Sequence, residues 1–222
     1  MNIRKMVSVV GVAVLPWVGN AATMSFDAPF SPTTVPFGPL SLSLSQFNPS
    51  WGTLMGVTLG IEATLQANIT AENNTAKTVK ATAWIIGDVG ASGPSGLAPT
   101  IAYGSIVGGP IMLGPSESPV GGGADFTDFG SPLSSSGSES ESTTNPGDFT
   151  PYLGTGTFNV DYTGDGGWMV TGVSDATVYV SDFQGWGKVT VTYEYMVPEP
   201  SQFAVIAGLG LVLFAGGRRF RS

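Results

Sequence analysis

Alternation of apolar and polar residues is the feature that most constrains the fold of this chain. From Val57 to Ala71 every odd position is Val, Leu, Ile or Ala, and the even positions are mostly Thr, Gln, Asn, Glu and Gly. A period of two places the apolar row on one face of an extended segment, which is typical of a half-buried β-strand. Because these 15 residues exceed the usual strand length, we expect a bend or bulge near Gly60, or two consecutive strands.

The same pattern continues beyond this segment. The sequence ENNT at Glu72–Thr75 predicts a turn, since Asn tolerates positive φ. Alternation resumes from Val79 to Ile85, so we expect an antiparallel hairpin over residues 57–85. Further alternating or β-rich runs occupy residues 40–47, 158–162, 168–173, 176–183 and 187–197.

Residues 24–196 contain no convincing helical periodicity. We therefore predict one all-β domain over residues 24–196, an antiparallel β-sandwich of the jelly-roll or immunoglobulin-like type.

One internal region departs from the strand pattern. Residues 108–150 are dominated by Gly, Pro, Ser and acidic residues, including SSSGSESESTTNPG. We expect a long loop with a disordered Ser-Glu tip, because its apolar surface is too small to offset the entropy of ordering. A functional loop is the alternative.

The N-terminus has the three-part layout of a secretory signal peptide. Arg4 and Lys5 precede an apolar run over residues 6–18, and small residues follow it. We expect export through the Sec translocon and removal of residues 1–21 by cleavage after Ala21, or else after Ala22. An uncleaved N-terminal anchor is the alternative.

The C-terminus, residues 197–222, combines three features in a fixed order. Pro198-Glu199-Pro200 comes first, an uncharged apolar run over residues 203–217 follows, and the chain ends with Arg218, Arg219 and Arg221. The run would form a helix of roughly 22 Å, which is short for a hydrocarbon core of roughly 30 Å. Arginine side chains that reach the headgroups compensate for a short span. We predict a transmembrane helix at 203–217 with its arginines in the cytoplasm; a core helix of a soluble protein is the alternative.

Composition excludes several classes of function. The chain has no cysteine and no histidine, which removes disulfides, Ser-His-Asp and Cys-His nucleophiles and His-rich zinc sites. Outside the two terminal segments only three basic residues, Lys77, Lys80 and Lys188, accompany 16 carboxylates. Such a domain repels the phosphates of nucleic acids, so we expect no nucleic-acid partner. Neutral sugars remain as ligands, and a glycosidase that uses carboxylates alone remains as a class of enzyme.

The candidate metal ligands are two pairs of aspartates in Gly-rich sequence. Asp161 and Asp165 lie in DYTGDGG, and Asp125 and Asp128 lie in ADFTDFG. Carboxylate and backbone oxygens in such turns can bind Ca²⁺. Neither pair has the full spacing of an EF-hand loop, and paired aspartates commonly stabilise turns. We therefore expect no obligatory cofactor, with calcium as the alternative.

Tryptophans are the candidate sugar-stacking residues. We expect Trp84, between Ala83 and Ile85, to be buried, and Trp51, Trp168 and Trp186, which adjoin glycines, are the candidates for exposed strand ends. Exposed rings in one plane on one sheet would favour carbohydrate binding. We expect core packing to be the main role of the four, with sugar stacking as the alternative.

The tail looks like the PEP-CTERM sorting signal of Gram-negative bacteria. The resemblance rests on Val197-Pro198-Glu199-Pro200-Ser201, the apolar run at 203–217 and the terminal arginines. It implies that a membrane-embedded exosortase recognises and cleaves at Pro198-Glu199-Pro200. The sorting system is associated with exopolysaccharide and biofilm matrix, and the implied location is the cell surface or extracellular matrix.

The body resembles the choice-of-anchor E domain, a secreted module found with interchangeable surface anchors. The likeness rests on FNPSWGTLMGVTL, the hairpin region around ENNT, GTGTFNV and VTVTYEYMVPEP. Neither resemblance carries catalytic residues. We therefore expect a non-enzymatic, structural or adhesive surface protein, with a carbohydrate-binding module as the first alternative and a glycosidase as the second.

Overall fold

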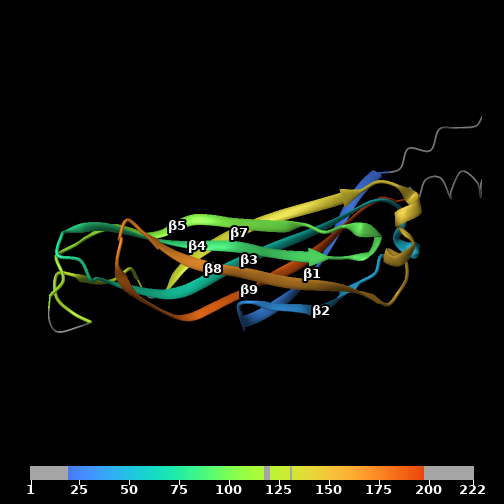
Figure 1. The fold of residues 1–222 in the computed structure, drawn as a ribbon. Coiled ribbons are helices and arrows are strands. Elements are labelled where there is room, and N and C mark those ends of the chain that lie inside the picture. The colour runs from blue at the N-terminus through green and yellow to red at the C-terminus, as the bar shows by residue number, and fades with distance from the viewer. Residues whose placement is uncertain (1–19, 118–120, 131, 198–222) are drawn as a thin grey trace, which may run out of the picture.

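The chain forms two antiparallel β-sheets packed face to face (Figure 1). The computed structural model describes residues 20–117, 121–130 and 132–197. Within these ranges the helical elements are four single turns of 3-10 helix. They are η1 (Pro49–Trp51), η2 (Pro94–Gly96), η3 (Pro146–Asp148) and η4 (Thr150–Tyr152). The predicted all-β sandwich is confirmed at this level.

The described strands form two sheets, a five-stranded sheet A and a four-stranded sheet B. Sheet A has the order β1-β9-β3, and β7 and β6 both pair with the free edge of β3. Its strands are β1 (Asn20–Thr34), β3 (Thr53–Asn73), β6 (Phe126–Asp128), β7 (Leu133–Thr143) and β9 (Ala176–Val197). Sheet B has the order β2-β8-β4-β5. Its strands are β2 (Phe37–Ser45), β4 (Val79–Ser92), β5 (Thr100–Leu113) and β8 (Thr157–Thr171).

The core lies between the two sheets and follows the alternation seen in the sequence. The odd positions of β3 from Val57 to Ala71 are all buried, at 4% exposure or less. Sheet B contributes the matching row, namely Ala81, Ala83, Ile85, Val89, Phe158, Val160 and Tyr162. Burial of apolar surface, at roughly 25 cal/mol per Å², is the main stabilising contribution of such a face.

The prediction of a break near Gly60 is wrong. β3 is one continuous strand, and Gly60 is paired with Thr190 of β9. The register against β9 shifts instead near the two ends, between Leu54 and Gly56 and between Gln66 and Asn68. β3 has partners on both edges, β9 on one and β7 and β6 on the other, and this support maintains a strand of unusual length.

The predicted hairpin over residues 57–85 is also wrong, although both of its strands exist. β3 belongs to sheet A and β4 to sheet B, so the turn after β3 carries the chain across the sandwich. Asn73, fully buried, fixes this turn: its Nδ2 donates to the carbonyl oxygens of Lys77 and Gly114, at 2.7 and 2.6 Å. Both strands have an apolar face, and facing each other across the core buries both faces.

Residues 108–150 do not form the predicted loop. This region contains the end of β5, all of β6 and β7, the turn η3 and the first residue of η4. The Ser-Glu sequence itself is strand β7, which pairs with β3 from Ala67–Leu133 to Val57–Thr143. The expectation failed because it counted only apolar surface. The free edge of β3 supplies backbone partners for β7 whatever side chains β7 carries.

Three buried tyrosines make hydrogen bonds that connect distant parts of the fold. Tyr103 of sheet B donates to the carbonyl oxygen of Ala63 in β3 at 2.7 Å, and Tyr193 of sheet A donates to that of Ser45 in β2 at 2.8 Å. Tyr152 donates to the carbonyl oxygen of Pro94 at 2.6 Å. Burial raises the pKa of Tyr103 and of Tyr152 to about 12, helped at Tyr152 by the charge of Asp148. Burial, followed by the effect of Tyr152, also raises the pKa of Tyr193.

Candidate functional site

The outer face of sheet A is a surface of small hydroxyl side chains. Between their bulges, the even positions of β3 from Thr58 to Gln66 and of β9 from Trp186 to Thr192 point away from the core, and β7 places a row of serines beside them. We call this surface the hydroxyl face; it consists of Ser25, Thr58, Thr64, Ser134, Ser136, Ser138, Ser140, Ser142, Thr190 and Thr192. Neighbouring strands are linked across it: the hydroxyl oxygens of Thr64 and Ser136 lie 2.8 Å apart, as do those of Ser25 and Thr192.

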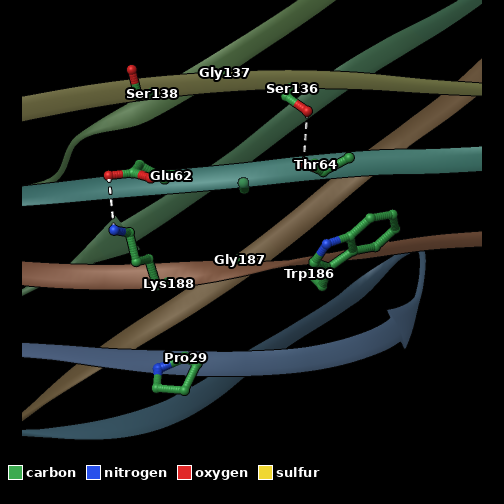
Figure 2. Close-up of a pocket in the computed structure, with 10 residues that line it drawn as sticks. Pro29, Glu62, Thr64, Ser136, Gly137, Ser138, Trp186, Gly187 and Lys188 are labelled. Atoms are coloured by element: carbon green, nitrogen blue, oxygen red, sulfur yellow. Dashed lines mark hydrogen bonds and ion pairs between the residues drawn. The ribbon is translucent and has the colours of Figure 1, made fainter.

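A shallow hollow of about 570 Å³ lies on the hydroxyl face, over β1, β9, β3 and β7 (Figure 2). Its side chains include one aromatic ring, one ion pair, a proline and several hydroxyls, from Pro29, Glu62, Thr64, Ser136, Ser138, Trp186 and Lys188. Lys188 Nζ lies 3.2 Å from Glu62 Oε1. A second hollow of about 370 Å³ adjoins it and shares Glu62, Ser138 and Lys188.

The glycines on either side of Trp186 hold its backbone close to the core. A Cβ at Gly187 would collide with the carbonyl oxygen of Glu62, and one at Gly185 would lie within 3.0 Å of Phe37 and Leu65. The space on the core side of Gly185 and Gly187 is therefore already occupied by atoms of neighbouring strands and side chains. Trp186 itself lies half-buried on the opposite side, paired with Thr64, and Figure 2 shows its ring beside that residue.

This arrangement offers groups that can bind a ligand. A tryptophan ring offers a flat apolar surface for stacking, and the hydroxyls and the ion pair around it offer donors and acceptors. The larger hollow contains a single carboxylate, that of Glu62, which is paired with Lys188. A glycosidase of the usual kind requires two carboxyl groups on opposite sides of a cleft.

The other tryptophans do not join Trp186 in one plane. Trp51 packs against the core, with ring centroids 6.3 Å from Phe26 and 5.5 Å from Phe47. Trp84 is half-buried rather than buried, and its Nε1 donates to Thr171 Oγ1 at 3.1 Å. Trp168 is 40% exposed, but it lies on β8 of sheet B. Trp186 is therefore the one predicted platform on the hydroxyl face.

The aspartates of DYTGDGG are not in a turn. Asp161 and Asp165 both lie within β8, on the outer side of sheet B. Four residues of extended strand separate them by roughly 13 Å, too far to share one ion. Asp165 Oδ1 instead accepts a hydrogen bond from the N–H of Gly166 at 2.7 Å.

The second aspartate pair is also separated. Asp125, directly before β6, is fully buried, whereas Asp128 is exposed at the end of that strand and accepts a hydrogen bond from the N–H of Gly130 at 3.0 Å. No group of three or more His, Cys, Asp or Glu side chains in the described part of the chain is placed to hold a metal ion. Sequence spacing alone did not reveal that Asp125 is buried.

The two ends of the described chain lie side by side. Val197, the last residue of β9, is paired with Asn20, and Ala21 is paired with Met196. Residues 1–19, Pro198 to Ser201, the run at 203–217 and the terminal arginines, Arg218, Arg219 and Arg221, lie outside the described residues. No helix among the residues that are described is long and apolar enough to cross a membrane.

Comparison with known proteins does not identify a family. No family model matches the chain. No curated protein matches it. The solved structures that it is similar to include infectious bursal disease virus, Gx strain, at 11% identity, covering 96% of this chain and 54% of that chain with a TM-score of 0.15. The Gt strain matches at 11% identity, with 88% and 48% coverage and a TM-score of 0.11. This chain spans about half the length of those chains, and similarity at this level carries no functional argument.

Proposed function

We propose that this protein is an exported structural or adhesive component of the cell surface or extracellular matrix of a Gram-negative bacterium, and that it acts without catalysis. The hydroxyl face is the observation that carries the proposal. It is a broad surface spread over four strands and hollowed only shallowly, which suits contact with an extended polymer. We also infer a jelly-roll rather than an immunoglobulin-like sandwich, because the strand orders β1-β9-β3-β7 and β2-β8-β4-β5 alternate the early strands between the sheets.

Sorting through the C-terminal signal is the second part of the proposal. Residues 1–21 act as a signal peptide, residues 203–217 hold the precursor in the membrane, and an exosortase recognises Pro198-Glu199-Pro200. Two prolines keep this motif extended and out of a helix. The pairing of Ala22 with Tyr195 supports the proposal, because the first residue after the expected cleavage site and the last strand before the motif then lie at the same end of sheet A. An enzyme at the membrane can therefore reach the motif without approaching the hydroxyl face.

A neutral polysaccharide is the ligand that the hollow at Trp186 favours. A pyranose ring stacks on an indole through its C–H face, while its hydroxyls exchange hydrogen bonds with side chains such as Thr64, Ser136 and Lys188. An anionic polymer fits less well, because the 16 carboxylates of the chain oppose it. This second function rests on Trp186 and is independent of the sorting step.

Replacement of Glu199 by Ala tests the sorting proposal. In a host that contains the exosortase, we expect Glu199→Ala to leave the full-length protein in the membrane fraction, while the wild-type protein is processed. An immunoblot of cell fractions measures both forms. Glu194→Ala, which makes the same change at an exposed position of β9, is the matched control and should be processed normally. Equal processing of Glu199→Ala and wild type would refute exosortase recognition at this motif.

Replacement of Trp186 by Ala tests polysaccharide binding. In affinity electrophoresis of the full-length chain through gels that contain a neutral polysaccharide, we expect the wild-type protein to be retarded and Trp186→Ala to lose most of the retardation. Trp168→Ala removes an exposed tryptophan from sheet B and should behave as the wild type. Absence of retardation across a panel of neutral polysaccharides would refute binding and leave the sorting proposal intact.

A further inference from the structure

One carboxylate oxygen of this protein is buried without a partner. Asp125 is fully buried beside the turn that follows β3. Its Oδ2 accepts a hydrogen bond from the N–H of Glu117 at 2.6 Å. Its Oδ1 is closed to solvent and has no hydrogen-bond partner among the described residues. The one ion pair in the described ranges, between Lys188 and Glu62, involves neither Asp125 nor Glu117.

Such an oxygen is unfavourable unless something compensates for its desolvation. A buried polar atom without a partner reduces the stability of a fold, and a buried charge does so more strongly. Native structures contain few such atoms, and an ion absent from the structure is one physical explanation for them.

The backbone around Asp125 is held in place by several hydrogen bonds. Asn73 donates its N–H to the carbonyl oxygen of Asp125 at 2.8 Å and its Nδ2 to that of Gly114 at 2.6 Å. Gly114 donates in turn to the carbonyl oxygen of Ala124 at 2.6 Å. The position of Asp125 is therefore set by the turn after β3 and the end of β5, before any ligand binds.

A second carboxylate oxygen faces the same space. A Cβ at Gly123, whose φ is +91°, would lie 3.1 Å from both Asp125 Oδ1 and Glu117 Oε2. Only glycine adopts this backbone conformation readily and leaves the space open. The two oxygens therefore approach the same point beside Gly123, and Glu117, whose side chain is exposed, can adjust toward Asp125.

We propose that Asp125 Oδ1 and Glu117 Oε2 bind a calcium ion between them beside Gly123, with water completing its coordination. Calcium takes oxygen ligands in flexible geometry, which suits two carboxylates on an irregular segment, whereas magnesium requires a near-ideal octahedron. The site keeps Asp125 of the ADFTDFG pair that the sequence suggested but has Glu117 in place of Asp128 as the second ligand. It lies apart from the hydroxyl face and does not depend on the proposed function.

Thermal unfolding with added calcium tests the site. The full-length chain in mild detergent is melted over a series of CaCl₂ concentrations, with NaCl adjusted to hold the ionic strength constant. For the wild-type protein we expect a saturable rise in Tm of about 5 °C at a hundred-fold excess over Kd. We expect Asp125→Asn to abolish the rise and Glu117→Gln to shift it to higher calcium concentrations.

Control variants distinguish calcium binding at this site from general screening of the negatively charged surface by calcium. Asp161→Asn removes one exposed charge from β8 and should retain the full rise. Glu117→Gln changes an exposed residue, so it decides the question even if Asp125→Asn does not fold. The proposal is overturned if the wild type shows no saturable rise, if both site variants keep it, or if magnesium reproduces it at equal concentration.

Discussion

Strands β3 and β7 lie side by side over eleven residue pairs, yet they form for different reasons. β3 has a buried apolar residue at every second position from Val57 to Ala71. In β7 only Leu133 is a buried apolar residue, and most of its other residues are exposed serines and glutamates. The buried apolar row is sufficient to explain why β3 is a strand of the sandwich core. β7 is a strand because its backbone pairs with the edge of β3 that β9 leaves free.

Contacts with the loops hold the far half of β7 against the rest of the fold. Glu141 Oε2 accepts a hydrogen bond from the N–H of Ala98 at 2.8 Å, and Thr143 Oγ1 donates to Asp148 Oδ2 at 2.7 Å. The glutamates also protect the outer edge of β7, because charged side chains discourage pairing with another chain. The comparison teaches that a polar segment can form an edge strand when its neighbour contributes most of the buried surface.

The largest effect should come from the apolar row of β3. Leu65 is fully buried, and Leu65→Ala should lower the free energy of unfolding by about 2–5 kcal/mol through lost burial and a residual cavity. Ser135, directly opposite on β7, provides the matched variant. Ser135→Ala should change the free energy of unfolding by about 0.5 kcal/mol or less. Urea denaturation of the full-length chain measures both. Similar losses for the two variants would contradict the distinction between these strands.

A proline scan of β7 should have an intermediate effect with a characteristic alternation. On an edge strand, the N–H of one residue points to the neighbouring strand and that of the next points to solvent. Of Ser138→Pro and Glu139→Pro, one therefore removes a hydrogen bond to β3 and the other does not. We expect the two variants to differ by about 1 kcal/mol in stability. Hydrogen exchange of the amides in β7 supplies a second readout, and equal effects would show that β7 is not an edge strand of this kind.

The smallest effect in ordinary buffers should come from Tyr103, which joins β5 to β3 across the sandwich. Its pKa is raised from 10.0 to about 12 in the folded protein, so its contribution to stability is complete below pH 10 and is lost as the pH rises towards 12. We expect Tm to fall less steeply between pH 10 and 12 for Tyr103→Phe than for the wild type. Tyr179, 64% exposed, provides the control Tyr179→Phe, whose slope should match the wild type. If the Tm of Tyr103→Phe still falls steeply between pH 10 and 12, another titratable group causes the loss of stability at alkaline pH.

The sequence by itself determined several of the half-buried strands and which of their faces turns inward, but it did not reveal β1, β5 or β7 as strands. The inward row of β3, the strand at 187–197 and the lack of long helices in residues 24–196 follow from a period of two, which is a local property of the chain. The threonines at even positions of β3 are visible in the same alternation, whereas Trp186, a candidate for an exposed strand end, lies half-buried within β9.

Only the tertiary structure decided which strands are neighbours. The expected partner of β3 was β4, but its partners are β9, β7 and β6. The gathering of Glu62, Trp186 and Ser136 in one hollow, and the burial of Asp125 beside Glu117, depend on that choice. The alternation predicts that one face of a strand is buried, but it does not predict which other strands cover that face. The neighbour is selected by backbone pairing and packing between residues far apart in the chain, which a local pattern does not contain.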